Sequence, residues 1–537
     1  MSVKTIPYAE TNYFSKLVGD YLAEKPELQS FYNRFPKLEN FEGQFVEKEK
    51  SLRLRSATNS RTTLINVLNT QYKNLKVSEA TQNNINSLSK ETSFTITTGH
   101  QLNLFTGPLY FLYKIFSVIN LSEELNKNHS NNHFVPVYWM ATEDHDFDEI
   151  NYFNLFGKKI EWKRKASGAV GELSTEGLEE LLNELKSELG ASENAQKLFS
   201  LFYEAYIKHN NLADATRYLA NELFSDYGLV IIDGNDSDLK KQFIPFAEKE
   251  LTENLAFKII NKTTEKLEGL GFKRQVNPRE INLFYLTENL RERIIEEEGV
   301  YKINNTELTF SKEEILKELK EFPERFSPNA LLRPLFQEVV LPNLCYVGGG
   351  GELAYWFQLK DYFKNVEVTF PILLLRNSVL LVPKKLIKKL EKLNENIEAL
   401  FLSQYDLEKK HTLQLSTIKI DFTTQRVHLK KQFKDLYEVA LQTEKSFLGA
   451  VAAQEKKQLN GLDNLEKRLL KAEKRKLADQ LNRLTSIQNQ LFPKESLQER
   501  TLNFSEFYLE FRDGLMKELK EKLNPLDHKF SIIELHS

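Results

Sequence analysis

Short apolar runs separated by helical patterns dominate most of the chain. Three short, strand-like runs, at residues 94–98, 135–141 and 228–234, are rich in apolar and β-branched residues and end in glycine or polar residues. Residues 341–351 and 366–382 supply further strand candidates. Apolar residues recur at helical spacing between these runs. Because strands alternate with helices, the pattern predicts an α/β fold with a mostly parallel, Rossmann-type sheet.

The predicted core spans residues 1–382 and begins with polar helices. Helical insertions are expected at about 165–225 and 239–325, where leucines recur at helical spacing. Within the second insertion, residues 285–310 contain a glycine and paired asparagines, which predict a small irregular β element.

The pattern of residues along the chain changes after residue 382. Two segments, 386–400 and 424–491, repeat leucine and isoleucine at heptad spacing and are rich in charged residues. Two such segments joined by a polar connection predict a long antiparallel α-helical coiled coil over residues 383–492. Residues 493–537, in which aromatic side chains recur at helical spacing, are expected to pack back on the core.

Composition narrows the function classes. A length of 537 residues predicts about two to four structural units, and a net charge of −3 provides no basic field for nucleic acid. The single cysteine, Cys345, excludes an internal disulfide and a thiolate zinc cluster. No apolar run approaches the ~20 residues of a membrane helix. The sequence therefore predicts a cytoplasmic protein that binds neither nucleic acid nor membrane.

The run 135–141 ends in an acidic cluster, EDHDFDE, at residues 143–149. Carboxylates at the end of a buried strand suit three functions: acid–base catalysis, recognition of an amine or sugar hydroxyls, and binding of a hard metal ion. Metal binding is the least favoured, because no second His/Asp pair stands at ligand spacing. The structural alternative is an acidic N-cap that opens the next helix.

Two other segments carry candidate binding residues. The run 94–98 ends in Gly99-His100-Gln101, and Lys114 lies about two turns into the helix expected after Gly107. Four glycines at 348–351 could form an anion-binding nest of backbone amides, although a flexible loop is the alternative. Upstream, Asn329 and Arg333 are four residues apart, so both could contact a carboxylate or phosphate from one helical face.

These motifs resemble the bacillithiol biosynthesis cysteine-adding enzyme (BshC) family, from about residue 94 to residue 504. The resemblance rests on the segments TGHQLNLFTGPLYFLYK, PVYWMATEDHDFDEIN, FSPNALLRPLFQE, GGGGELAYW and ERTLNF. It implies a Rossmann-type core related to class I aminoacyl-tRNA synthetases, helical connective-peptide insertions and a coiled coil that forms a homodimer. It also implies the last step of bacillithiol synthesis in the cytoplasm, in which cysteine is joined to glucosaminyl-malate through an amide bond.

Amide formation needs an activated carboxylate, a neutral amine and stabilisation of an oxyanion. The predicted catalytic residues are His100, Glu143, Asp144, His145 and Asp146. The predicted substrate- or cofactor-binding residues are Thr98, Gly99, Gln101, Thr106, Gly107, Lys114, Asn151, Asn329, Arg333, Gly348, Gly349, Gly350, Gly351 and Glu352.

The chain departs from the synthetase pattern in two motifs. It has no His-x-Gly-His sequence and no Lys-Met-Ser-Lys-Ser loop. The activating donor therefore stays open, with ATP or another nucleotide expected from the resemblance and no metal predicted. Two alternatives are a coiled-coil scaffold with a vestigial nucleotide-binding-like core, and a metal-dependent hydrolase that uses the acidic cluster.

Overall fold

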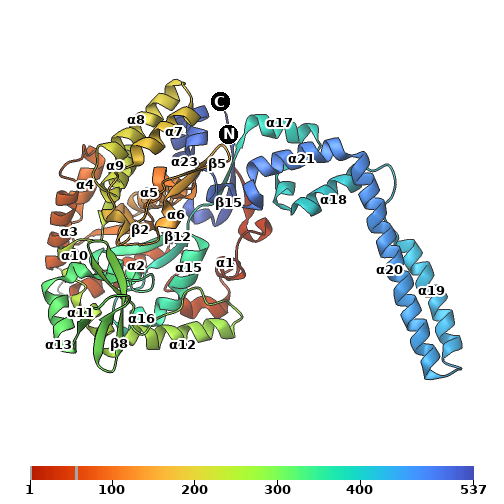
Figure 1. Ribbon diagram of the computed structural model, residues 1–537, viewed down its shortest axis with the longest axis horizontal. Helices are drawn as coiled ribbons and strands as arrows, with labels where there is room; N and C mark the ends of the chain where they lie inside the picture. The colour runs from red at the N-terminus through yellow and green to blue at the C-terminus, as the bar shows by residue number, and fades with distance from the viewer. Residues whose placement is uncertain (1–2, 55–57, 537) are drawn as a thin grey trace. The chain divides into compact units, whose positions relative to one another are not determined.

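The computed structural model describes residues 3–54 and 58–536 and divides into two compact units (Figure 1). The first unit comprises Met1–Leu380 together with Gln498–Ser537, and the second comprises Leu381–Leu497.

A parallel five-stranded sheet forms the centre of the first unit, in the order β13-β12-β2-β3-β6. Its strands are β2 (Ser93–His100), β3 (His133–Met140), β6 (Val230–Asp233), β12 (Asn343–Gly348) and β13 (Ile372–Leu375). They are buried almost throughout, which explains their continuous apolar runs. The predicted Rossmann-type sheet is confirmed, and the candidate at 366–382 contains two strands, β13 and β14 (Val379–Pro383).

The order of the strands places a switch point at the centre of this sheet. The chain runs from β2 outward through β3 to β6, and then returns to the other side of β2 to form β12 and β13. Loops that leave β2 and β12 consequently diverge at their carboxyl ends, which is where open α/β sheets bind ligands. The helix α5 (Tyr110–Asn128) connects β2 to β3 and is buried along most of its length.

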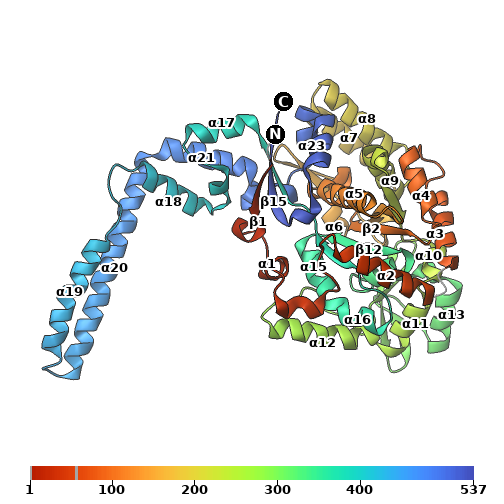
Figure 2. The same cartoon turned by 180° about the vertical axis from the view of Figure 1, so that it is seen from behind.

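Helices and three further sheets accompany this centre among the described residues. The N-terminal helices are α1 (Lys16–Leu22), α2 (Asn40–Leu54), α3 (Thr58–Gln71) and α4 (Glu79–Ser87). The first insertion contains α7 (Leu178–Leu189), α8 (Glu193–Ile207) and α9 (Leu212–Phe224). Near the ends of the chain, β1 (Lys4–Pro7) pairs antiparallel with β15 (Lys529–Leu535), as Figure 2 shows. The C-terminal segment also contributes α22 (Ser505–Phe511) and α23 (Asp513–Lys522).

The β element predicted at residues 285–310 of the second insertion is confirmed, and it belongs to a larger sheet than the helical character of the insertion predicted. Its antiparallel strands, in the order β10-β9-β8-β7-β11, are β7 (Leu283–Thr287), β8 (Leu290–Glu297), β9 (Val300–Ile303), β10 (Thr309–Phe310) and β11 (Phe326–Pro328). Left-handed turn residues such as Asn289 and Gly299 separate neighbouring strands. The helix predicted before this sheet is divided into α10 (Ser237–Lys241), α11 (Ile244–Glu253) and α12 (Leu255–Gly269). Pro245 begins α11 and Asn254, with φ 51°, ends it.

The second unit contains an antiparallel helical pair, α19 (Thr423–Ala440) and α20 (Lys445–Lys476). Phe433, Ala440 and Val451 form a buried cluster between these two helices. The remaining helices are α17 (Lys384–Lys392), α18 (Gln404–Leu415) and α21 (Ala478–Leu491).

The predicted coiled coil is present, but its predicted pairing is wrong. Residues 386–400 do not form one helix, because Asn394 adopts a left-handed φ of 53° and residues Ile397–Phe401 form a 3₁₀ turn. The long antiparallel pair therefore arises within residues 423–476 and not between 386–400 and 424–491.

Candidate active site at the edge of the parallel sheet

A cavity of about 610 Å³ opens at the carboxyl ends of β2, β3 and β12 in the first unit. Its size is typical of a small-molecule site. Of the residues predicted from the sequence, it is lined by Gly99, His100, Gln101, Lys114, Glu143, Asp144, Asn329, Arg333, Gly349, Gly350, Gly351 and Glu352. The fold thus brings together residues from four separate motifs.

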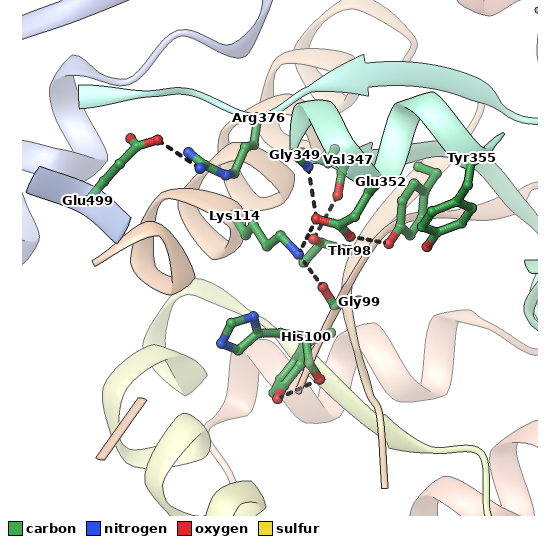
Figure 3. Close-up of polar contacts among 12 residues, drawn as sticks. Thr98, Gly99, His100, Lys114, Val347, Gly349, Glu352, Tyr355, Arg376 and Glu499 are labelled. Atoms are coloured by element: carbon green, nitrogen blue, oxygen red, sulfur yellow. Dashed lines mark hydrogen bonds and ion pairs between the residues drawn. The ribbon is translucent and has the colours of Figure 1, made fainter. Parts of the chain in front are cut away.

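Lys114 lies at the switch point between β2 and β12 (Figure 3). Its Nζ donates to the Gly99 carbonyl oxygen at 2.6 Å and lies 2.7 Å from Glu352 Oε1. Burial lowers the pKa of Lys114, and the neighbouring Glu352 carboxylate opposes that shift. Lys114 therefore ties the end of β2 to the first turn of α15 (Gly350–Trp356).

Glu352 occupies the place at which the glycine run was expected to bind an anion. Its Oε1 accepts from the Gly349 backbone N–H at 2.9 Å, and its Oε2 accepts from the Tyr346 hydroxyl at 2.6 Å. Burial alone would raise the pKa of Glu352, but Lys114 and these hydrogen bonds hold it below its ordinary value. The protein's own carboxylate thus satisfies the Gly349 amide and Lys114.

His100 is a buried neutral side chain beside this ion pair. Its ring lies against Tyr110 and Phe111, with centroid distances of 5.4 and 4.9 Å. Burial, and after it the positive charge of Lys114, lowers the pKa of His100 well below its ordinary value. Among the described residues, His100 Nε2 has no hydrogen-bond partner. His100 therefore lines the cavity as a neutral imidazole whose buried Nε2 has no partner within the described ranges.

Asp144 and Glu149 form a pair of carboxylates on the β3 side of the cavity. The Gln101 side-chain amide donates to both, at 2.9 Å to Asp144 Oδ2 and 2.7 Å to Glu149 Oε2. Burial would raise the pKa of Asp144, but hydrogen bonds from His145 and Gln101 lower it below its ordinary value. Asp144 is therefore ionised at neutral pH.

The other members of the acidic cluster take separate partners. Glu143 Oε1 lies 2.5 Å from Nζ of the buried Lys240. The half-exposed His145 receives a hydrogen bond on Nδ1 from Arg291 at 2.7 Å. Among residues 3–54 and 58–536, no group of three or more His, Cys, Asp or Glu side chains is arranged to hold a metal ion.

Seven predicted site residues do not line the cavity and instead support it or lie beside it: Thr98, Thr106, Gly107, His145, Asp146, Asn151 and Gly348. Thr98 donates to the Val347 carbonyl oxygen at 2.7 Å and so joins β2 to β12. Gly107 has a φ of 63°, and a Cβ on it would lie 2.5 Å from the Asn103 Cβ, so the turn before α5 requires glycine.

Three arginines of the cavity were missed by the sequence analysis: Arg291, Arg376 and Arg500. Arg291 comes from β8 and stacks on Phe284, with its guanidinium 4.0 Å from the ring centroid. Arg376 follows β13, and its Nη2 donates to Glu499 Oε1 at 2.7 Å. Arg500 lies in the segment ERTLNF, which carries part of the family resemblance but was not predicted to line a site. No single stretch of sequence contains these residues, so spacing offered no signal for them.

A doubly wound parallel sheet with a charged cavity at its switch point defines a Rossmann-type protein with a small-molecule site. Residues 1–377 match the family described as "Bacillithiol biosynthesis BshC, N-terminal Rossmann-like domain". Residues 379–535 match "Bacillithiol biosynthesis BshC, C-terminal coiled-coil domain". The chain belongs to the BshC family.

Three relatives that carry the name "Putative cysteine ligase BshC" align with the chain over nearly its full length. The protein of Flavobacterium johnsoniae is 55% identical and covers 100% of both chains. That of Christiangramia forsetii is 55% identical over 99% of both. That of Bacillus thuringiensis is 29% identical over 97% of this chain and 98% of its own. Within the described ranges, no helix is both long and apolar enough to cross a lipid bilayer.

Proposed function

We propose that this protein is the cysteine ligase of bacillithiol biosynthesis, which joins the carboxyl group of L-cysteine to the amine of glucosaminyl-malate. The observation that carries this proposal is the family match over both units, together with the ionised Asp144 in a cavity of substrate size. A binding scaffold has no need for buried, polarised groups at the carboxyl edge of its sheet.

The reaction forms a C–N bond between the amine nitrogen and the cysteine carboxyl carbon, which loses one oxygen to the activating donor. In the proposal, Asp144 and Glu149 bind the substrate amine as its cation, and Glu149 accepts its proton before attack. The third N–H of the buried Lys114, beyond those bound to Gly99 and Glu352, stabilises the negative charge that develops on the carbonyl oxygen. Gln101 fixes both carboxylates relative to that centre.

ATP or another nucleotide is the proposed activating donor. Arg333 suits its phosphates, because it lines the cavity beside the glycine segment and has no carboxylate within 4 Å among the described residues. Its guanidinium instead donates to Gln337 Oε1 at 3.0 Å and to the Tyr355 hydroxyl at 3.3 Å. The donor would supply a good leaving group on the cysteine carboxyl.

We also propose a cytoplasmic homodimer that associates through the α19–α20 pair. Its apolar surface residues are Val427, Leu436, Val439, Leu441, Phe447 and Leu465, each at least 45% exposed. Unpartnered apolar residues on a long helical pair favour association with a second copy. Sedimentation of the full chain should give a dimer, and Val439→Glu should shift it toward a monomer. A wild-type monomer at micromolar concentration would contradict this.

The ligase proposal is tested in a strain that lacks this protein. Such a strain should accumulate glucosaminyl-malate and lack bacillithiol, as measured by mass spectrometry of thiol extracts. The wild-type chain should restore bacillithiol, whereas Asp144→Asn should not, at equal protein abundance. Normal bacillithiol in the deletion strain would overturn the proposal.

A further inference from the structure

We propose that Arg376 and Arg500 form a carboxylate-binding subsite at the β13 side of the cavity, and that the malyl carboxylates of glucosaminyl-malate bind there. This inference rests on the proposed function. It orients the substrate, with its malyl carboxylates near the end of β13 and its amine near the end of β3.

Arg376 is buried, lines the cavity and is held by the protein through two of its three guanidinium nitrogens. Its Nη1 donates to the Asn377 carbonyl oxygen and the Ser378 hydroxyl, and its Nη2 donates to Glu499 Oε1. Its Nε is buried and has no hydrogen-bond partner among the described residues. A Cβ on Gly349 would lie 3.7 Å from that Nε, so this donor lies beside the glycine segment that lines the cavity (Figure 3). An arginine that the protein holds through both terminal nitrogens is preorganised for a ligand oxygen.

Arg500 supplies a second cation next to this donor. It follows Glu499 in the chain, lines the same cavity and is exposed. No carboxylate among the described residues lies within 4 Å of its guanidinium. Arg376 and Arg500 both lower the pKa of Tyr110, although burial and Glu352 raise it, so both positive charges act on the same hydroxyl. Arg376 also stacks on that ring, with its guanidinium 5.0 Å from the centroid.

Glu499 is a positioning residue for this subsite. Its Oε1 accepts from Arg376 and Ser378, and its Oε2 accepts from the Val379 N–H at 3.0 Å. The same C-terminal segment holds the loop that precedes α5, because Asn503 Nδ2 donates to the carbonyl oxygens of Phe105 and Gly107 at 2.8 and 2.6 Å. Residues 499–503 thus connect the arginine pair to the loop that carries His100 and Gln101.

The carboxylate pair and the arginine pair of the cavity lie beside different strands, although Arg291 of β8 also lies near Asp144. Asp144 and Glu149 follow β3, whereas Arg376 follows β13, and β12 and β2 separate these strands in the sheet. Lys114, placed between the two ends, is already neutralised by Glu352. A ligand with an amine at one end and two carboxylates at the other would satisfy both ends. Cysteine carries its amine and carboxyl on one carbon, so it cannot span the two clusters.

The test is titration calorimetry of the full chain with glucosaminyl-malate, L-malate, glucosamine, L-cysteine, ATP and inorganic phosphate. Arg500→Gln should weaken the binding of glucosaminyl-malate and L-malate by about tenfold to a hundredfold, as expected for loss of a charge-assisted hydrogen bond. The affinities for glucosamine, L-cysteine, ATP and phosphate should not change. Arg483→Gln, at an exposed arginine of α21, is the matched control and should change none of them.

Three outcomes would overturn the subsite: unchanged affinity for glucosaminyl-malate in Arg500→Gln, a selective loss of L-cysteine binding, or a selective loss of ATP and phosphate binding.

Glu499→Gln adds a kinetic readout, since it should raise KM for glucosaminyl-malate several-fold and leave KM for cysteine and kcat unchanged. A loss of kcat alone would contradict its positioning role. Binding does not require turnover. A chain that binds glucosaminyl-malate through Arg500 but makes no bacillithiol would therefore contradict only the ligase proposal.

Discussion

The two ends of the cavity are built in opposite ways. The acidic end comes from one short loop after β3, in which Asp144 and Glu149 are close in sequence and share Gln101. The basic end is assembled from distant segments, with Lys114 on α5, Arg376 after β13 and Arg500 in the C-terminal segment. The acidic end is partly open to solvent, whereas Lys114 and Arg376 are buried.

This contrast predicts which variants lose mainly activity and which lose stability as well. Buried charges depend on their partners, so a change at Lys114 or Arg376 should reduce both stability and activity. Asp144 is partly exposed, so a change there should cost less stability than a change at Lys114 or Arg376 and should act mainly on activity.

The largest effect is expected from Lys114→Met. This change leaves Glu352 buried without its cation, so the free energy of unfolding should fall by about 3–5 kcal/mol. The kcat/KM of the remaining folded protein should fall by about 10²–10³, as for loss of an oxyanion-stabilising group. Chemical denaturation and steady-state kinetics measure the two losses.

Lys48→Met is the matched control for that change. Lys48 and Glu338 form a fully buried ion pair, 3.1 Å apart, outside the cavity. This variant should lose at least as much stability but keep the kcat/KM of the folded fraction. Equal activity losses in both variants would mean that Lys114 acts only through folding.

At the acidic end, Asp144→Asn should lower kcat/KM by about 10² because the substrate amine loses the carboxylate that positions it. Its melting temperature should fall by less than that of Lys114→Met. Asp148→Asn, in the same loop but outside the cavity, should retain activity. A shared loss in both variants would assign the effect to loop geometry.

The sequence predicted the acidic end and only part of the basic end for a physical reason. Carboxylates within one loop are brought to the sheet edge together, so their spacing alone indicates a site. Arg376 and Arg500 become neighbours only through the return of the C-terminal segment to the core, which no periodicity encodes. The pairing of helices in the second unit could not be predicted for a similar reason. The heptad pattern predicted helices there, but the break at Asn394 excludes residues 386–400 from the long pair.

The turn at Gly107 before α5 tests whether the acidic and basic ends of the cavity depend on one segment. Gly107→Ala places a side chain at a φ of 63° and against Asn103, and should cost about 1–3 kcal/mol of stability. Because this turn precedes α5, KM for both substrates should change together. A stability loss with unchanged kinetics would show that neither end depends on the turn.

The smallest effect is expected in the pH dependence of folding. His100 stays neutral in the folded protein, whereas its unfolded pKa is about 6.5. The unfolded state therefore binds the extra proton below that pH, and His100 contributes a loss of stability of up to ~1.4 kcal/mol per pH unit as the pH falls. His100→Gln should flatten the slope below pH 6.5 in denaturation experiments. His428→Gln, at an exposed histidine of α19, should leave it unchanged, and identical slopes in the wild type and His100→Gln would contradict the burial argument.

The most direct test of the two-ended site is a crystal structure of the full chain with glucosaminyl-malate bound. The proposed account places the substrate amine within hydrogen-bond distance of Asp144 or Glu149, and the malyl carboxylates on Arg376 and Arg500. A substrate bound in the reverse orientation, or outside this cavity, would contradict the account.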